Sequence, residues 1–363
     1  MRSIRYVVVG RRMLAVSAAV LMLALGIVVG APTARAGVPG CVWQQPTLIN
    51  GWQSGQGGYG TGDPSVCAGT DGMVYVSGSV AAPNGATSDE FAVLPSVDAP
   101  AHNDYFTVYT NNGTPGVVRI KPDGSMWAYY GNAMQFTSLA GISFPADTAG
   151  VTGLMPLLAG WQSASGGNPG YFISNGVVHL DGSVYHPNGT PQWGSDTAWT
   201  FAQLPVAATP SHCMEVNTYT FAGGSNDVFI DQTNGDIHGA NAQFTSLAGI
   251  SYPASANAWQ PLSLVNSVGW PCDPVDSSVG YGVVYLTGYV GVSQGYSGEF
   301  AVLPPGQRPA HTLYLNVSGT GSGSNNWANL RIDPDGEMDV YNLGGYPNGG
   351  YFSLDGLSFR VGS

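Results

Sequence analysis

Three histidines recur at one position of a repeated motif, and histidine is the side chain most often used to ligate metal ions and transfer protons near neutral pH. The motif runs from a Phe through Leu-Pro and a second Pro to the His, with identical internal spacing in each copy. Its copies are FAVLPSVDAPAH (Phe91 to His102), FAQLPVAATPSH (Phe201 to His212) and FAVLPPGQRPAH (Phe300 to His311).

Two interpretations of these histidines follow from the residues. Three units packed around a pseudo-threefold axis could bring His102, His212 and His311 together, and three imidazoles are a sound zinc set. Tandem units in a line would instead keep them far apart. The motif also has the chemistry of a corner, because its prolines cannot donate to a β-ladder and force the chain across to another sheet. We expect the corner, with each ring contacting its own unit only.

Catalytic patterns in the chain have simpler interpretations. GVSQG (Gly291 to Gly295) matches a nucleophile elbow around Ser293, but it lies in a Gly/Ser-rich loop, whereas an elbow joins a strand to a helix. DPDGE (Asp333 to Glu337) has turn chemistry and lacks the later ligands of a calcium loop. No glutamate recurs across the units as a glycosidase carboxylate might; the glutamates are Glu90, Glu215, Glu299 and Glu337. We therefore expect no enzymatic activity and no cofactor.

Binding through aromatic side chains is the more plausible chemistry. Aromatic ring faces stack on the apolar faces of sugars, while amides, carboxylates and hydroxyls of neighbouring loops bind the sugar hydroxyls. Each such ring could also be ordinary core or loop packing, and the recurring Trp52 and Trp161 are expected in the core. The candidate ligand-binding residues are Trp127, Tyr129, Trp193, Trp199, Tyr296, Trp327 and Tyr346.

The elements that position these residues repeat three times. Besides the histidine motif, the blocks GMVYVSGSV, GVVHLDGSV and GVVYLTGYV share a register, as do FTSLAGISFP, FTSLAGISYP and FSLDGLSFR. The segments VVRI and NLRI alternate apolar and polar side chains and precede the turns Pro122-Asp123-Gly124 and Pro334-Asp335-Gly336, while the second copy has Gln232-Thr233-Asn234-Gly235 there. This pattern is typical of short antiparallel strands. We predict an all-β fold of three tandem antiparallel β-sandwich (jelly-roll-like) repeats, spanning residues 37–146, 147–254 and 255–363, here called units 1, 2 and 3.

The N-terminus has the pattern of an export signal. A basic head precedes an apolar run from Met13 to Gly30, and Ala34-Arg35-Ala36 supplies small residues for cleavage before Gly37. The apolar run is long enough that an uncleaved membrane anchor is the alternative. Without residues 1–36 the chain keeps five basic residues against 22 acidic ones, a net charge of −17, which disfavours nucleic acid and anionic lipid as partners.

Four cysteines fit an oxidising, extracellular compartment and allow three pairings. Cys41 and Cys67 both lie at the front of unit 1 and are the expected pair. Cys213 and Cys272 would then join unit 2 to unit 3.

Unit 3 resembles a β-sandwich module of bacteriophage tail-fibre and receptor-binding proteins. The resemblance is carried by FAVLPPGQRPAH, RIDPDGEM and FSLDGLSFR, which match a Leu-Pro-x-Gly-x-Arg-Pro corner, a Pro-Asp-Gly hairpin and a closing Leu-x-Gly-aromatic strand. It covers about half of each unit, and units 1 and 2 lack the Gly-x-Arg. Such modules serve as receptor binders, spacers and trimerisation units, and they carry no export signal, so this chain would reuse the module.

These observations together predict a secreted binding or adhesion protein that recognises a glycan or cell-envelope polymer. A purely structural extracellular or envelope protein is the alternative, and a secreted hydrolase is a third possibility. The sequence leaves the oligomeric state open.

Overall fold

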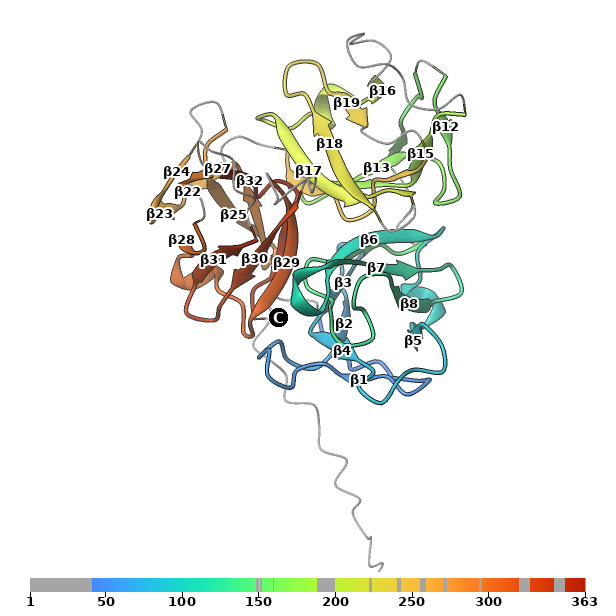
Figure 1. Ribbon diagram of the computed structural model, residues 1–363. Helices are drawn as coiled ribbons and strands as arrows, with labels where there is room; N and C mark the ends of the chain where they lie inside the picture. Colours follow the sequence, from blue (N-terminus) through green and yellow to red (C-terminus); the bar gives the residue numbers. More distant parts are fainter. Residues whose placement is uncertain are drawn as a thin grey trace, which may run out of the picture. The chain divides into compact units, whose positions relative to one another are not determined.

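The strands of the computed structural model fall into three successive groups that follow the repeated blocks (Figure 1). The structure describes residues 41–363 with gaps at 148–149, 151, 159, 188–199, 222–223, 240–242, 255–258, 270–272, 294–295, 320–326, 343–349 and 363. The all-β prediction is confirmed, since the helical elements of the described residues are short 3-10 turns. Among these residues no helix is long and apolar enough to cross a membrane.

Unit 1 contains ten short strands. They are β1 (Gln53–Ser54), β2 (Ser65–Ala68), β3 (Met73–Ser77), β4 (Ser79–Ala81), β5 (Glu90–Val93), β6 (Asp104–Tyr109), β7 (Pro115–Ile120), β8 (Ser125–Tyr129), β9 (Thr137–Ser138) and β10 (Ser143–Pro145). They pair antiparallel in the sheet orders β1-β4-β9, β10-β3-β2 and β5-β8-β7-β6.

Unit 2 has the same arrangement. Its strands are β11 (Gly153–Leu154), β12 (Gln162–Ser163), β13 (Gly170–Ser174), β14 (Val177–Asp181), β15 (Ser183–Tyr185), β16 (Thr200–Gln203), β17 (Met214–Tyr219), β18 (Ser225–Ile230), β19 (Asp236–Gly239), β20 (Thr245–Ser246) and β21 (Ser251–Pro253). The sheet orders are β12-β15-β20, β11-β13-β14-β21 and β16-β19-β18-β17.

Unit 3 repeats the topology again. Its strands are β22 (Gln260–Pro261), β23 (Ser263–Leu264), β24 (Ser267–Gly269), β25 (Asp276–Gly280), β26 (Val283–Thr287), β27 (Tyr289–Val292), β28 (Gly298–Val302), β29 (Leu313–Ser318), β30 (Trp327–Ile332), β31 (Glu337–Tyr341), β32 (Gly350–Ser353) and β33 (Ser358–Arg360). The sheet orders are β24-β27-β32, β22-β25-β26-β33 and β23-β28-β31-β30-β29.

The histidine motif forms a corner in each unit. The recurring Phe91, Phe201 and Phe300 are fully buried in three separate apolar clusters and lie on β5, β16 and β28, the strands that precede the corners. A 3-10 turn follows the Leu-Pro in each copy: η1 (Ser96–Asp98), η4 (Val206–Ala208) and η7 (Pro305–Gln307). The next strand begins two residues after the His, so the prolines do stop one strand and set the start of another.

The hairpin turn after β7 shows why its residues are required. Both the backbone N–H and the hydroxyl of Ser125 donate to the Asp123 carboxylate, at 3.0 and 2.6 Å. Gly124 has φ +83°, and a Cβ there would lie 2.4 Å from the Leu94 carbonyl oxygen. Only glycine therefore fits between the hairpin and the corner.

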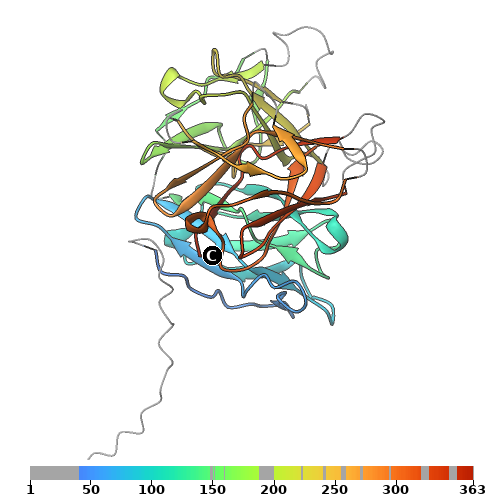
Figure 2. The same ribbon diagram turned by 90° about the vertical axis from the view of Figure 1, so that its left-hand side faces the viewer.

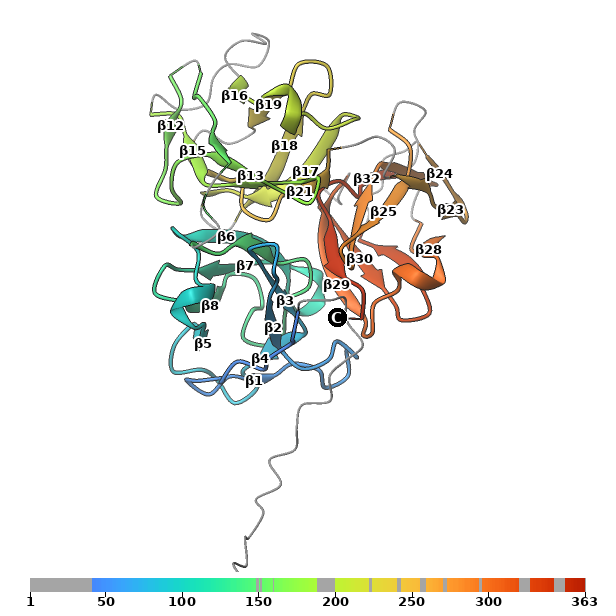
Figure 3. The same cartoon turned by 180° about the vertical axis from the view of Figure 1, so that it is seen from behind.

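The three units meet along β6, β17 and β29, which contact one another pairwise and lie side by side in Figures 1 and 3. Figure 2 shows the same molecule turned by 90°. The described residues of all three units belong to one compact body. A small cavity of about 60 Å³ lies where these strands meet, and it is lined by equivalent residues of the three units. They include Phe106, Val216 and Leu315 from the strands, and Gly141, Gly249 and Gly356 from the turn before the last strand of each unit, here called the closing turn.

The closing glycines show that the contacts run in a cycle. A Cβ on Gly249 of unit 2 would lie 3.1 Å from Phe106 of unit 1. The corresponding distances are 2.7 Å from Gly356 to Val216 and 2.9 Å from Gly141 to Leu315. Unit 1 therefore packs on unit 2, unit 2 on unit 3, and unit 3 back on unit 1.

Candidate functional site

Each recurring histidine lies at a different interface and contacts the next unit in the cycle. His102 approaches Asp181 of unit 2, and the His212 ring is hydrogen-bonded to Thr287 of unit 3. His311 packs against Gly62 of unit 1, where a Cβ would lie 2.6 Å from the ring. The expectation that each ring contacts only its own unit is wrong, because the cyclic packing places the next unit over every corner. The three imidazoles are also not brought to one zinc site.

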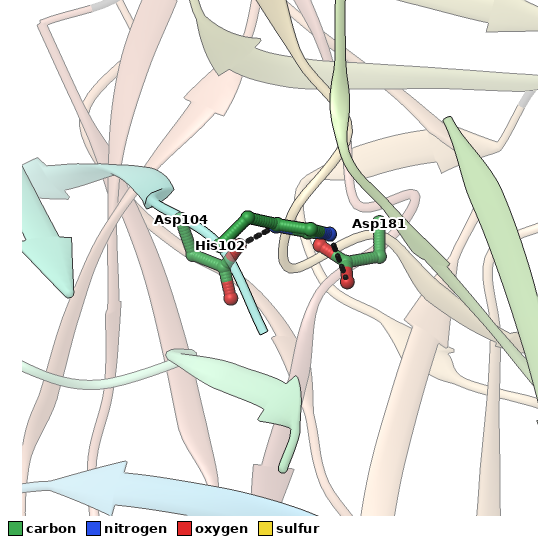
Figure 4. A group of neighbouring side chains, drawn as sticks. All are labelled: His102, Asp104 and Asp181. Atoms are coloured by element: carbon green, nitrogen blue, oxygen red, sulfur yellow. Dashed lines mark hydrogen bonds and ion pairs between the residues drawn. The ribbon is translucent and has the colours of Figure 1, made fainter. Parts of the chain in front are cut away.

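His102 is held between two carboxylates from two units (Figure 4). Its Nδ1 lies 3.1 Å from Asp104 Oδ1, and its Nε2 lies 3.2 Å from Asp181 Oδ2. Burial lowers the pKa of His102, but the hydrogen bond to Asp104 and the charge of Asp181 outweigh it, so the pKa is raised. The arrangement is a charged clamp that joins unit 1 to unit 2, called here the His102 clamp.

Aromatic rings fill the interface beside this clamp. Tyr105 of unit 1 stacks on Tyr219 of unit 2 at 5.3 Å between centroids and meets Phe244 edge-on at 5.2 Å. The interface between units 3 and 1 is built alike, with Tyr314 in the position of Tyr105, 5.0 Å from Tyr109. These rings are packing residues that also border the surface.

The interface between units 1 and 2 contains an open groove of about 430 Å³. Its aromatic lining consists of Tyr105, Tyr185, Tyr219, Phe221 and Phe244, and its polar lining of Ser163, Ser165 and Gln243. Phe221 is 55% exposed, although large apolar rings are usually buried. We call this site the aromatic groove.

A shorter loop leaves the aromatic groove open. In unit 1, Pro64 follows Ser54 by ten positions, and the loop between them carries Tyr59. In unit 2, Pro169 follows Ser163 by only six positions, and the loop carries no aromatic residue. This loop of unit 2 therefore offers no ring that could cover Phe244 as Tyr59 covers its equivalent in unit 1.

The interface between units 2 and 3 has a different, acidic character. Glu215 takes the position of Tyr105 and Tyr314, and its carboxylate accepts a 2.6 Å hydrogen bond from Ser318. Burial and the nearby Asp227 raise the pKa of Glu215 to about 8. Burial raises the pKa of Asp227 to about 6. This carboxyl pair is enclosed between units, so it does not have the accessible, separated carboxylates of a glycosidase.

The four predicted ligand-binding aromatic residues that the structure describes do not form one site. Trp127 and Tyr129 lie on β8, where Lys121 Nζ lies 4.2 Å from the centroid of the Trp127 ring. Tyr129 lines a shallow hollow of about 540 Å³ with Tyr130. Tyr296 donates to the Glu299 carbonyl and Trp327 lies on β30, both in unit 3. Trp193, Trp199 and Tyr346 lie outside the described residues.

The residues of the aromatic groove were not predicted from the sequence. Tyr105 and Tyr219 lie on strands that follow the histidine corner, and an alternating strand pattern does not distinguish a packed ring from one that borders a groove. The available signal was the length difference between the loops before Pro64 and Pro169, read together with the exposed Phe221.

The cysteines and the weaker catalytic patterns are placed as follows. Cys41 and Cys67 form a disulfide, which is typical of an oxidising, non-cytosolic environment. Cys213 is exposed with a free thiol, and its predicted partner Cys272 lies outside the described residues.

Ser293 is exposed directly after β27, without a following helix. In the Asp333 to Glu337 segment, Asp335 accepts the Glu337 N–H at 3.1 Å, as in a turn.

No family model, no curated protein and no solved structure matches the chain.

Proposed function

We propose that this protein is an extracellular carbohydrate-binding protein whose ligand occupies the aromatic groove between units 1 and 2. In this proposal residues 1–36 direct export, and three jelly-roll-like β-sandwich repeats close into a ring that fixes the groove. The resemblance to phage receptor-binding modules supports this proposal, because those modules also present binding surfaces on β-sandwich scaffolds.

The observation that carries the proposal is the combination of rings and polar groups in the groove. Five aromatic residues line its 430 Å³, which falls within the size range of small-ligand sites. Serine and glutamine side chains at its edge can exchange hydrogen bonds with sugar hydroxyls. Tyr185 keeps its hydroxyl oriented by donating to Gln162 at 2.7 Å, so its ring is held in place before a ligand binds.

The charge of the groove indicates the type of carbohydrate. None of the residues that the structure places in its lining is ionisable near neutral pH, although the chain as a whole is strongly acidic. An anionic polysaccharide would be repelled by the protein and would meet no basic partner in the groove. A neutral glycan or a neutral segment of a cell-envelope polymer is therefore the proposed ligand class.

A glycan array with the mature protein tests this proposal. Binding to neutral glycans is expected, and Phe221→Ala should weaken it because the substitution removes an exposed wall of the groove. Phe229→Ala is the matched control, since Phe229 is 46% exposed but lies on β18 outside the groove. Failure of the wild-type protein to retain any glycan or envelope polymer would instead favour a structural extracellular protein.

A further inference from the structure

The interface between units 2 and 3 carries acidic residues where the other two interfaces carry glycine and alanine. Gly78, Gly182 and Gly288, which follow β3, β14 and β26, show which residues are equivalent in the three units. A Cβ at these glycines would contact the carbonyl oxygens of Asp63, Asn168 and Pro274 respectively, so these three residues occupy the same position. The residues just before these three are Gly62, Gly167 and Asp273. Asp273 therefore stands where two glycines pack against His311 and His102.

A second acid joins the same interface from the closing turn. The sequences Leu139-Ala140-Gly141, Leu247-Ala248-Gly249 and Leu354-Asp355-Gly356 are equivalent, so Asp355 replaces an alanine. His212, Asp273 and Asp355 each offer one ligand atom, and the three atoms lie within 4.8 Å of one another. The three residues are 8%, 6% and 3% exposed.

Asp273 has an oxygen without a partner. Its Oδ1 is buried and accepts no hydrogen bond from the residues that the structure describes, although Asp273 belongs to the cluster with His212 and Asp355. A buried carboxylate oxygen without a donor is costly unless something compensates its charge. The His102 clamp also holds such an oxygen, Asp104 Oδ2, but there the imidazole faces both carboxylates, whereas no basic side chain of the described residues pairs with Asp273.

Basic side chains do not supply the compensation among the described residues. Each of the five has other neighbours: Arg119 and Lys121 lie by Trp127, Arg308 binds the Leu303 carbonyl, Arg331 pairs with Asp333 and Asp339, and Arg360 lies over Tyr75. The cluster is thus an enclosed set of one imidazole and two carboxylates without a protein cation.

Asp355 is held rigidly in this cluster. Its Oδ1 accepts from the Thr287 hydroxyl at 2.6 Å and from the Gly288 N–H at 2.9 Å, while its Oδ2 accepts from the Glu215 N–H at 2.8 Å. Outer hydrogen bonds of this kind orient metal-ligating side chains. Asp355 also lines the cavity where the three units meet, which has room for water molecules.

The His102 clamp has the same composition, one imidazole and two carboxylates, but a different arrangement. Both ring nitrogens of His102 already face a carboxylate, one from Asp104 and one from Asp181, so an imidazolium there compensates part of their negative charge. In the other cluster neither Asp273 nor Asp355 is hydrogen-bonded to the His212 ring in the part of the chain that the structure describes.

We propose that His212, Asp273 and Asp355 bind a divalent transition-metal ion, with Zn²⁺ as the first choice, and that the ion joins unit 2 to unit 3. Imidazole nitrogen and carboxylate oxygen are both zinc ligands, and an imidazole ligand disfavours calcium and magnesium. With ligand distances of about 2.0–2.1 Å, the donor atoms would draw together to roughly 3.3 Å from one another. The inference does not depend on carbohydrate binding.

Calorimetric titration of ZnCl₂ into chelator-treated mature protein, with metal content by mass spectrometry, tests the site. We expect one tight Zn²⁺ per chain and a melting temperature that rises with Zn²⁺. Asp273→Asn should weaken Zn²⁺ binding at least about 10-fold, because removing a metal ligand should reduce the affinity at least as much as removing a residue that only hydrogen-bonds to a ligand. Asp273→Gly restores the residue of the other two interfaces, so it should fold and lose the Zn²⁺ response.

Asp181→Asn is the matched control, since it removes an equally buried acid from the His102 clamp and should leave Zn²⁺ binding unchanged. Zn²⁺ binding of equal affinity in wild type and Asp273→Gly would assign the metal to surface histidines and overturn the proposal. Absence of saturable Zn²⁺ binding, or a stabilisation by CaCl₂ but not by ZnCl₂, would overturn it as well.

Discussion

The ring of Tyr59 stacks on the ring of Phe136, with centroids 3.9 Å apart and an interplanar angle of 22°. Phe244 is the equivalent of Phe136 in unit 2, and the shorter unit 2 loop supplies no ring to cover it. The same β topology thus produces a filled interface between units 3 and 1 and an open groove between units 1 and 2. A four-residue difference in one loop creates the proposed binding site.

Replacing Phe221 by Ala should weaken binding of any glycan identified on the array. The exposed ring offers a stacking surface worth about 0.5–1.5 kcal/mol, which corresponds to roughly a 2- to 10-fold increase in Kd. Calorimetric titration of the glycan measures the change. Phe229→Ala should leave Kd unchanged, and an equal loss in both variants would place the ligand elsewhere.

The sequence predicted the local structure well. Alternating blocks and Pro-Asp-Gly turns indicated antiparallel strands, and Trp52 and Trp161 are core residues at 4% exposure, as expected. Such features depend on a few neighbouring residues, so a short stretch of sequence is enough to indicate them.

The arrangement of the units could not be predicted in this way, because the cyclic packing depends on contacts between residues that are distant in sequence. The His102 ring contacts Asp181 of another unit, which no local pattern indicates. The sequence predicts Trp127 as a sugar-binding ring, yet Lys121 from the turn between β7 and β8 lies over it. The groove itself arises from missing loop residues, and a motif search detects residues that are present.

The His102 clamp should make stability depend on pH. The pKa of His102 is raised on folding, so its contribution is complete below the unfolded pKa of about 6.5 and is lost as the pH rises through the folded pKa. Burial also raises the pKa values of Asp104 and Asp181, so their contributions to stability likewise decrease as the pH rises. Asp147 is a further acidic neighbour of His102.

We therefore expect His102→Ala to cost about 1.5–3 kcal/mol at pH 6 and clearly less at pH 9. Urea denaturation at both pH values measures the difference. His238→Ala is the control, because His238 is bonded to Thr200 inside one sheet of unit 2. A cost that is the same at pH 6 and pH 9 would show that the clamp is not charged.

Gly167→Ala should destabilise the contact between units 1 and 2. A Cβ at Gly167 would lie 2.2 Å from the His102 ring, and the residue has φ +89°. Gly176 has φ +80° but open space around it, so Gly176→Ala reports the backbone strain alone, about 1–2 kcal/mol. Gly167→Ala should cost a further 1–3 kcal/mol or so from overpacking. Equal thermal shifts in the two variants would contradict the close approach of His102 to unit 2.

Removal of the disulfide should lower stability while leaving the fold intact. Cys41→Ser opens a bond between residues 26 positions apart, a loss of about 3 kcal/mol in the chain-entropy account. Urea denaturation of the variant measures it. Cys213→Ser changes an exposed free thiol and should alter stability by no more than about 0.5 kcal/mol. A large loss from Cys213→Ser would indicate a second bridge.

The most direct test of the aromatic groove is a glycan array run with the wild-type protein and with a loop graft. In the graft, unit 2 residues Ala164 to Asn168 are replaced by unit 1 residues Gly55 to Asp63, which places the counterpart of Tyr59 over Phe244. We expect the wild-type protein to bind neutral glycans and the graft to lose that binding, with a melting temperature equal to or above that of wild type. Unchanged glycan binding by a correctly folded graft would contradict the assignment of the ligand site to this groove.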